Sequence, residues 1–228
     1  MKNMNIVNFS GGKDSTAMLL MMIDRCMQID DIVFCDTGME FSEMYEHIKK
    51  VENMINRKVT IIKGKHTYKY YLGEHIKRNG KIGYGHPDFI NRWCTQTLKK
   101  TPIAQYTKQF DNVIEYHGIA FDEKHRCKKN KENKRLIKYP LVNWEITEKQ
   151  ALEYCYSKGL NWGGLYEKFA RVSCWCCPLS RIGELRVLYN DFPDLWKELQ
   201  EMDKQSFRKF RKDYSVSDLT EKFSNEKL

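Results

Sequence analysis

The sequence lacks the features of an exported or membrane protein. Its opening, MKNMNIVNFSGGKDS, has no basic region followed by an apolar one, as a signal peptide requires. The longest apolar run, residues 17–23, is far shorter than the roughly 20 residues that span a bilayer. Internal repeats and low-complexity stretches are also absent. We therefore expect a soluble cytoplasmic protein with no membrane partner.

The composition is that of a folded protein with a basic surface. Hydrophobic residues make up 41% and charged residues 30% of the 228 residues, which argues against disorder. In a reducing compartment, the eight cysteines are expected to be thiols or metal ligands rather than disulfides. The net charge of +9 suits a nucleotide or nucleic-acid partner, but ordinary basic proteins share it. The densest basic run, residues 124–138, is either a solvated loop or a polyanion contact.

Apolar periodicity predicts an α/β fold. Strands are expected at the short apolar runs 5–9, 32–35, 59–62 and 112–117. Helices are expected at 16–27, 42–55 and 91–108, with Pro102 bending or interrupting the last of them. This alternation indicates a doubly wound parallel sheet with helices on both faces. The irregular residues 64–88 are expected to form a lid over a ligand or a disordered loop.

The last third of the sequence predicts a small helical, cysteine-containing part. Thr147 and Gln150 fit a capping box that begins a helix ending near Ser157. Further helices are expected at residues 181–189 and 193–204, with a loose polar tail after Tyr214. We expect a nucleotide-binding domain over residues 1–145 and a C-terminal helical extension over residues 146–228.

A phosphate-binding loop follows the first expected strand, with the sequence Ser10-Gly11-Gly12-Lys13-Asp14-Ser15. The two glycines let the backbone turn tightly, so that N–H groups of the loop and of the next helix point at phosphate oxygens. The serine hydroxyls add donors, and Lys13 neutralises phosphate charge. Asp14 is expected either to hold a magnesium-bound water or to cap the helix. Lys13 and Asp14 are therefore candidate catalytic residues.

The loop is not a Walker motif, which needs a longer glycine loop with Ser or Thr after the lysine. It resembles the signature of the ATP pyrophosphatases, also called adenine nucleotide alpha hydrolases. Four further segments resemble the phosphoadenylyl-sulfate (PAPS) reductase family, and together the matches cover residues 4–180. They are Asp36-Thr37-Gly38; Arg92-Trp93-Cys94 with Lys99, Lys100 and Pro102; Gly118-Ile119 with Asp122, Glu123 and Arg126; and Tyr139 to Trp144.

The resemblance implies an adenine nucleotide as ligand, either ATP or a sulfonucleotide (PAPS or adenylyl sulfate), with Mg²⁺. Asp36, Thr37 and Gly38 follow the second expected strand, where an open parallel sheet binds its ligands. They are expected to contact adenine and ribose. Gly118 and Arg126 are further candidate nucleotide-binding residues.

The cysteines near the C-terminal end predict a metal centre. Cys174 and Cys177 form a Cys-x-x-Cys pair, whose thiolates can face one metal or one corner of an iron–sulfur cluster. In cluster-bearing adenylyl-sulfate reductases, a Cys-Cys pair joins such a motif around a [4Fe–4S] cluster. Here Trp93 stands beside Cys94, so only one of those two cysteines is present. The fourth ligand is either Cys176 or none.

Two alternatives to the iron–sulfur cluster stay open, a zinc site on the same cysteines and a set of buried thiols. Cys26, Cys35 and Cys155 fall in apolar patterns and are expected in the core. Cys127 has no assignment.

The reductases of this family need a nucleophilic cysteine near the C-terminus, but no cysteine follows Cys177. We therefore expect ATP-dependent adenylylation coupled to sulfur transfer, with Cys176 as a candidate relay and tRNA or DNA as a candidate acceptor. A cysteine desulfurase or a thiol reductant would be the donor partner, and a homodimer is a further expectation. The alternatives are a sulfonucleotide reductase that uses a cluster cysteine and a non-catalytic module that binds nucleotides or nucleic acid.

Overall fold

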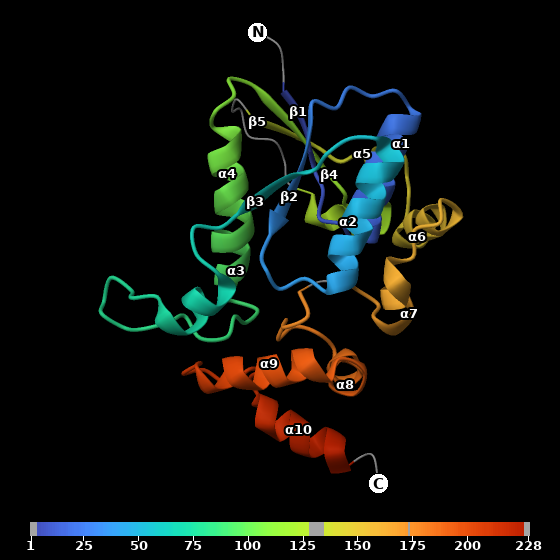
Figure 1. Ribbon diagram of the computed structural model, residues 1–228. Helices are drawn as coiled ribbons and strands as arrows, with labels where there is room; N and C mark the ends of the chain where they lie inside the picture. The colour runs from blue at the N-terminus through green and yellow to red at the C-terminus, as the bar shows by residue number, and fades with distance from the viewer. Residues whose placement is uncertain (1–3, 128–134, 173, 226–228) are drawn as a thin grey trace. The chain divides into compact units, whose positions relative to one another are not determined.

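The computed structural model describes residues 4–127, 135–172 and 174–225. Its centre is a five-stranded sheet with strand order β3-β2-β1-β4-β5 (Figure 1). The central strand β1 runs parallel to β2 and β4, and β4 runs parallel to β5. The strands are β1 (Met4–Asn8), β2 (Asp31–Asp36), β3 (Thr60–Lys63), β4 (Val113–His117) and β5 (Arg135–Lys138).

Helices cover both faces of the sheet, which confirms the predicted doubly wound fold. In Figure 1, α1 (Lys13–Asp24) and α2 (Ser42–Ile55) lie on one face and α4 (Thr101–Thr107) lies on the other. On the α4 face, Ile6 of β1 packs with Val33 and Val113 of the neighbouring strands and with Ile103 of α4. Helix α1 is buried almost all round, which explains its nearly continuous apolar sequence.

The expected helix over residues 91–108 is built in three pieces. It begins with α3 (Trp93–Thr95), widens into a π-helical turn at Gln96–Lys100 and continues as α4. Pro102 is the physical reason, because a proline has no N–H to donate and its ring crowds the preceding turn of a helix. The wider π turn just before it accommodates the ring.

Strand β5 was not predicted from the sequence. Its four residues, RLIK, place two apolar side chains between two charged ones, and the strand pairs with β4 at the edge of the sheet. Its first side chain reaches a buried carboxylate, since Arg135 Nη2 donates to Glu115 Oε2 of β4 over 2.7 Å. The middle of the basic run, residues 128–134, lies outside the described residues.

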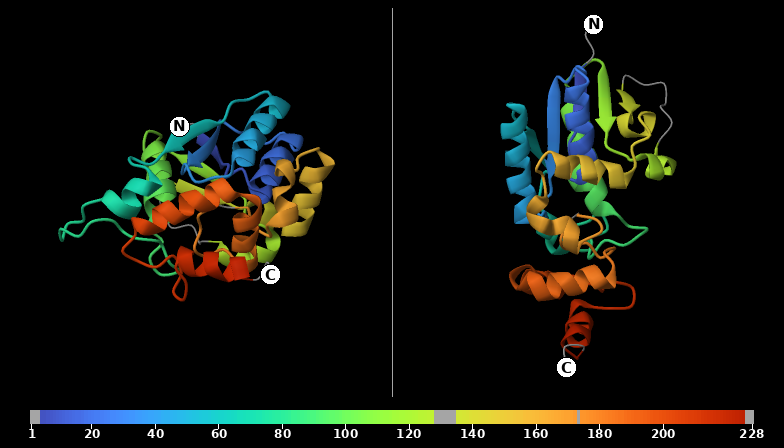
Figure 2. Two further views of the ribbon diagram at one scale, coloured as in Figure 1. Left: turned by 60° about the horizontal axis from the view of Figure 1, so that its bottom comes forward. Right: turned by 90° about the vertical axis from the view of Figure 1, so that its right-hand side faces the viewer.

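The expectation of a loose tail after Tyr214 was wrong. Residues Val216–Asn225 form α10, because Val216, Leu219 and Phe223 recur at helical spacing and are all buried. Helix α10 packs against α8 (Ile182–Asp191) and α9 (Pro193–Lys204), which are orange to red in Figure 2. These two helices lie within a residue or two of their predicted positions.

The remaining short helices connect the sheet to the C-terminal part. They are α5 (Pro140–Asn143), α6 (Glu148–Ser157) and α7 (Leu165–Lys168). The predicted capping box begins α6, since Gln150 N–H donates to Thr147 Oγ1 over 3.3 Å and Thr147 N–H donates to Gln150 Oε1 over 2.9 Å. Within the described ranges, no helix is long and apolar enough to cross a membrane.

The chain forms two compact units made of alternating stretches of sequence. Unit 1 comprises Met1–Asp36, Ser42–Ile62 and Pro102–Tyr166, and unit 2 comprises Thr37–Phe41, Lys63–Thr101 and Glu167–Leu228. Unit 1 holds nearly the whole sheet, whereas unit 2 holds the irregular segment after β3 and helices α8 to α10. No unit boundary falls at residue 145, and the proposed division at that residue stays a prediction.

Candidate nucleotide and cysteine sites

The predicted phosphate-binding loop joins β1 to α1 in unit 1. It lies where the strand order reverses, between β1 and β4, which is where doubly wound sheets bind their ligands. Gly11 has a φ of +76°, a conformation that favours glycine. The loop closes on itself through Ser15, whose hydroxyl accepts from Ser10 N–H over 3.2 Å and donates to the Gly12 carbonyl over 3.0 Å.

Two aromatic side chains from the end of unit 1 hold this loop in place. Trp162 is 1% exposed, and its Nε1–H donates to the Gly11 carbonyl over 2.7 Å. The hydroxyl of Tyr166 accepts a hydrogen bond from the Lys13 backbone N–H over 2.8 Å. Tyr166 therefore occupies one of the amides that a phosphate would use. No local pattern indicates either role, because both residues lie about 150 positions away from the loop.

A buried histidine supports the same corner. The His47 ring stacks on Trp162 with centroids 4.2 Å apart, and its Nε2 lies 3.0 Å from Thr16 Oγ1. Burial, with a smaller contribution from the Lys50 charge, lowers the pKa of His47 to about 3. The ring is therefore neutral at physiological pH, and it supports the loop through its contacts with Trp162 and Thr16.

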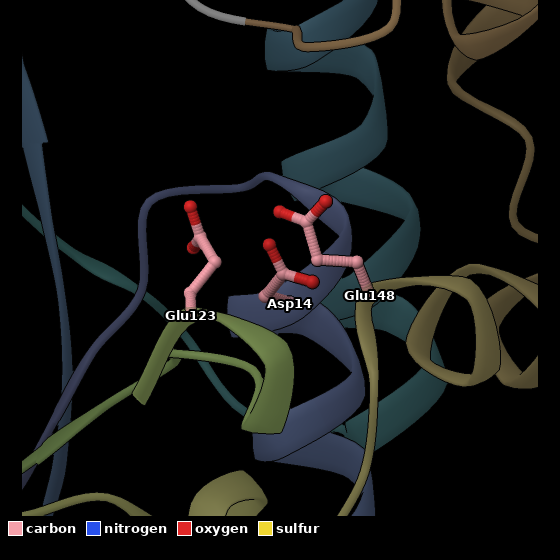
Figure 3. A group of neighbouring side chains, drawn as sticks. All are labelled: Asp14, Glu123 and Glu148. Atoms are coloured by element: carbon pink, nitrogen blue, oxygen red, sulfur yellow. The ribbon is translucent and has the colours of Figure 1, made fainter. Parts of the chain in front are cut away.

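Three carboxylates gather at the start of α1. Oxygen atoms of Asp14, Glu123 and Glu148 all lie within 4.8 Å of one another (Figure 3). The Lys13 ammonium lies among them, with Nζ 2.9 Å from Asp14 Oδ2 and 3.2 Å from Glu148 Oε1. Burial raises the pKa of Asp14 to about 6, although the adjacent Lys13 charge opposes the rise.

Hard oxygen ligands of this kind suit Mg²⁺, which binds through one or two carboxylates plus substrate phosphates. The donor set therefore fits the expected divalent cation. Sequence reasoning named Asp14 and Glu123, but gave a role at a cation to Asp14 alone. Glu123 stood next to the Gly118-Ile119 match, and Glu148 opens α6, but no local pattern joined them to the loop.

Two further predicted nucleotide residues lie beside this group. A Cβ on Gly118 would come within 2.7 Å of the backbone of Ser15, so only glycine lets β4 end directly against the first turn of α1. Arg126 pairs with Glu123, and this hydrogen bond raises the pKa of Arg126. The structure thus brings both residues to the loop, while their contact with a nucleotide stays a prediction.

The Asp36-Thr37-Gly38 segment is divided between the units. In unit 1, Asp36 accepts a hydrogen bond from the Tyr45 hydroxyl over 2.7 Å. In unit 2, Thr37 Oγ1 donates to Glu40 Oε1 over 2.9 Å and lies 3.6 Å from Cys174 Sγ. Gly38 has a φ of +72° with open space around it. Contact of these residues with adenine or ribose stays a prediction, and Thr37 also belongs to the surroundings of the cysteines.

Unit 2 brings the four predicted metal-binding cysteines together around one aromatic residue. Tyr68 interacts electrostatically with the sulfur atoms of all four, which are Cys94, Cys174, Cys176 and Cys177. Burial raises the pKa of Cys174 to about 12, and the nearby Glu40 carboxylate adds to the rise. Burial likewise raises the pKa of Cys176, which is 1% exposed, and of Cys94. In the absence of a metal, these thiols are therefore protonated.

The described sulfur atoms are not arranged as a closed zinc site in this structure. A tetrahedral zinc ion with Zn–S distances of about 2.3 Å holds its sulfur ligands roughly 3.8 Å apart. Among the described residues, no three cysteine sulfurs lie within 4.8 Å of one another. The thiols are soft ligands, which suit both an iron–sulfur cluster and zinc. The donor set therefore fits an iron–sulfur cluster, and the choice between a cluster and zinc stays a prediction.

Three other cysteines, Cys26, Cys35 and Cys155, were expected in the core, and the structure corrects one of them. Cys155 is buried, and Cys35 is partly buried against the sheet core. Cys26 is exposed, because α1 ends at Asp24 and Cys26 follows in a left-handed conformation with a φ of +53°. Cys127 is half-buried, and its role stays open.

Comparisons with known proteins agree with this geometry. Residues 4–180 match the model of the phosphoadenosine phosphosulfate reductase domain. Two uncharacterised proteins of Methanocaldococcus jannaschii are 30% identical over 203 residues and 26% identical over 199 residues. These matches cover 85% and 84% of this chain but 40% and 45% of the relatives, so the chain spans less than half of their length.

Among solved structures, the fold is similar to a PAPS reductase from Candida auris in a phosphate complex. The TM-score is 0.54 at 16% identity, covering 77% of this chain and 82% of that one. A U34-tRNA thiolase from Methanococcus maripaludis, solved with its [4Fe–4S] cluster, aligns with a TM-score of 0.46 at 14% identity, covering 99% and 73%.

Proposed function

The chain belongs to the phosphoadenosine phosphosulfate reductase domain family, and from this premise we propose that it is an ATP-dependent enzyme that adenylylates an acceptor and transfers sulfur to it. One observation carries the proposal. The loop at the strand-order reversal places an ammonium group and three carboxylates beside the amides at the start of α1. This arrangement suits a nucleotide polyphosphate that carries a divalent cation.

The loop residues would act on the leaving group. Loop amides and Lys13 bind the β- and γ-phosphates, while an acceptor oxygen attacks the α-phosphorus. The bond between that phosphorus and the bridging oxygen of the β-phosphate breaks, and pyrophosphate leaves with its new charge stabilised by Lys13. A divalent cation held by Asp14, Glu123 and Glu148 would neutralise further charge on pyrophosphate. A sulfur nucleophile then attacks the adenylylated carbon, and AMP leaves with the acceptor oxygen.

The cysteines of unit 2 would supply the sulfur. A cluster held by three cysteines would leave one iron open to present a sulfur atom, and Cys176 would then be the fourth thiol available as a relay. Release of sulfite from a sulfonucleotide needs instead an accessible attacking thiol. Within the site, Cys176 is buried, and Cys94, Cys174 and Cys177 are half-buried and would be needed as cluster ligands, which disfavours this chemistry. A cysteine desulfurase is the donor partner that the proposal requires.

A nucleic acid is the acceptor that the surface of unit 2 favours. Residues 63–101 carry nine lysines and arginines but two carboxylates, which is a net +7 of the chain's +9. An open cavity of about 470 Å³ in this segment is lined by Tyr84, Arg92, Trp93 and Lys100, among others. Ile90, which also lines it, is 95% exposed. Basic residues beside aromatic and apolar ones are typical of surfaces that bind single-stranded nucleic acid.

Product analysis tests the reaction. We expect purified protein with ATP, Mg²⁺, a cysteine desulfurase with cysteine, and bulk tRNA to produce AMP and pyrophosphate together with thiolated nucleoside. Lys13→Ala should abolish both products, whereas Lys149→Ala, which removes an exposed lysine of the same unit, should change neither. Sulfite released from PAPS or adenylyl sulfate with a thiol reductant, without ATP turnover, would replace this proposal with sulfonucleotide reduction. Nucleotide binding with no turnover on tRNA or DNA would favour a non-catalytic module.

Binding measurements test the acceptor class separately. Fluorescence anisotropy with single-stranded RNA and DNA should show affinity that falls as salt rises from about 50 to 200 mM. Replacing both Arg92 and Lys100 by alanine should weaken binding and lower the salt slope by about one for each side chain that binds a phosphate group in the wild type. Equal affinity of this variant and the wild type would remove the cavity surface from the acceptor site.

A further inference from the structure

A buried hydroxyl group in unit 2 makes no well-formed hydrogen bond within the part of the chain that the structure describes. Tyr68 is 3% exposed, and its hydroxyl lies within hydrogen-bond reach of the Cys176 thiol without making a well-formed hydrogen bond to any described residue. A buried polar group without a hydrogen bond costs about 1–3 kcal/mol, so such groups are rare in folded proteins. The phenol ring itself is well packed, against Trp93 with centroids 4.9 Å apart. Packing thus fixes the position of the ring, and its hydroxyl can donate a hydrogen bond to an added acceptor.

The surroundings of this hydroxyl indicate the kind of acceptor. Its nearest sulfur is that of Cys176, and the sulfur atoms of all four candidate metal ligands interact electrostatically with it. Trp93, which packs on the ring, is the chain neighbour of Cys94. The hydroxyl therefore lies among the cysteines. A protonated phenol is a hydrogen-bond donor, and thiolate and sulfide are the acceptors that a loaded cysteine site would offer.

We infer that the Tyr68 hydroxyl donates a hydrogen bond to a sulfur atom of the cluster held by these cysteines and thereby raises the reduction potential of that cluster. A donor at the sulfur stabilises the extra electron of the reduced state, and hydrogen bonds to sulfur are among the determinants of cluster potential. Tyr68 is a positioning and tuning residue in this role, not a ligand. The inference rests on the iron–sulfur part of the proposed function and is independent of the ATP reaction.

The irregular segment that contains Tyr68 gains a function from this inference. Tyr68 contributes its hydroxyl group to the metal centre, and no other aromatic residue described for this segment has the cysteines as electrostatic neighbours. Tyr71, three positions later, also packs near Trp93, with centroids 6.0 Å apart. Its electrostatic neighbours are Tyr84 and Tyr70 rather than the cysteines. Tyr71 is therefore a matched control for the loss of one phenol hydroxyl.

Redox titration of the full chain tests the inference. Wild type, Tyr68→Phe and Tyr71→Phe would be purified anaerobically, their iron and sulfide counted, and their midpoint potentials measured by voltammetry. We expect iron content near that of wild type in both variants, a more negative potential in Tyr68→Phe, and an unchanged potential in Tyr71→Phe. Equal potentials in Tyr68→Phe and wild type would overturn the inference, as would a wild-type protein that binds no iron.

A second substitution keeps the test decisive if Tyr68→Phe fails to retain iron. Incorporating 3,5-difluorotyrosine at position 68 keeps the hydroxyl and makes it a stronger donor, so the midpoint potential should become more positive. An unchanged potential would refute the hydrogen bond. Measuring ATP cleavage to AMP and pyrophosphate distinguishes a failure of this inference from a failure of the proposed ATP reaction. A protein that cleaves ATP but holds no iron would contradict the cluster and the role of Tyr68, and would leave the adenylylation step of the proposed function standing.

Discussion

At the scale of single residues, the glycine at the end of β4 shows how closely the nucleotide loop is packed. Gly118 meets the first turn of α1 with no room for a side chain, since a Cβ would lie 2.7 Å from both Ser15 N and Ser15 Cα. The close approach is to backbone atoms, which cannot rotate away as a side chain can. Any larger residue must therefore move α1 and the amides that precede it.

We predict that Gly118→Ala lowers the free energy of unfolding by about 1–3 kcal/mol and weakens ATP binding. The control is Gly183→Ala in α8, where an added Cβ meets no atom within 4 Å. Alanine is favoured over glycine inside a helix by about 0.5–1 kcal/mol, so this control should be neutral or stabilising. Urea unfolding and calorimetric ATP titration measure both effects. Wild-type ATP affinity in Gly118→Ala would show that the contact does not position the loop.

The buried histidine beside the loop predicts a pH dependence of stability. His47 has a pKa of about 3 in the folded chain and near 6.5 when unfolded. Between these values the unfolded chain binds the proton and the folded chain does not. The free energy of unfolding should therefore fall by about 1.4 kcal/mol for each pH unit below 6.5.

The variant His47→Gln keeps a polar contact for Thr16 but cannot titrate in this range. Its unfolding free energy should be lower at neutral pH, because the stacking on Trp162 is lost. Between pH 6.5 and 4.5 its free energy should fall less steeply with pH than that of wild type. Parallel slopes in urea titrations of the two proteins would contradict a neutral His47.

Individual site residues could be predicted from the sequence where all the functional groups of a site lie in one short segment. The loop from Ser10 to Ser15 could be assigned because its glycines, hydroxyls and lysine are consecutive. Trp162, Tyr166, Glu123 and Glu148 could not be assigned, because each reaches the loop from more than a hundred residues away. A tryptophan, a tyrosine or a glutamate has many ordinary places in a fold, and local sequence does not distinguish them.

At the scale of elements, the sequence was informative wherever periodicity was strong. The capping box of α6 and the apolar strands β1, β2 and β4 were predicted within about two residues. Strand β5 was missed because a four-residue strand with a charged residue at each end is too short for a distinctive pattern. Helix α10 was missed because its apolar positions are few and separated by polar ones.

Helix α10 also predicts a specific loss of stability. Leu219 is 0% exposed and lies on the face that packs against α8 and α9. We expect Leu219→Ala to destabilise the protein by about 2–4 kcal/mol. Glu221→Ala, an exposed change two residues later, should shift stability by less than about 0.5 kcal/mol. Urea unfolding followed by tryptophan fluorescence reports the difference, since Trp196 of α9 lies 5.8 Å from Phe223 between ring centroids. Equal midpoints would mean that α10 does not contribute to the packed unit.

At the scale of the whole molecule, the two candidate chemistries are carried by different sets of residues. The loop, the carboxylates and their aromatic supports all belong to unit 1, whereas the four cysteines and Tyr68 all belong to unit 2. The hydrogen bonds and packing contacts described above for the loop join residues of unit 1, and those described for the cysteines join residues of unit 2. The two units nevertheless alternate along the chain, so neither corresponds to a continuous stretch of sequence.

This division predicts that the two binding properties can be lost separately, while the overall reaction needs both. Lys13→Ala should weaken ATP binding at least tenfold, because an ammonium group facing phosphate is worth about 1.5–3 kcal/mol, yet leave the iron content unchanged. Cys177→Ala should lose iron and keep the wild-type affinity for ATP. Both variants should fail to thiolate an acceptor, since adenylylation and sulfur supply are successive steps. Calorimetry, iron analysis and nucleoside analysis on the same preparations measure the three properties. Loss of ATP binding in Cys177→Ala, with its unfolding midpoint unchanged, would show that the two sites depend on each other.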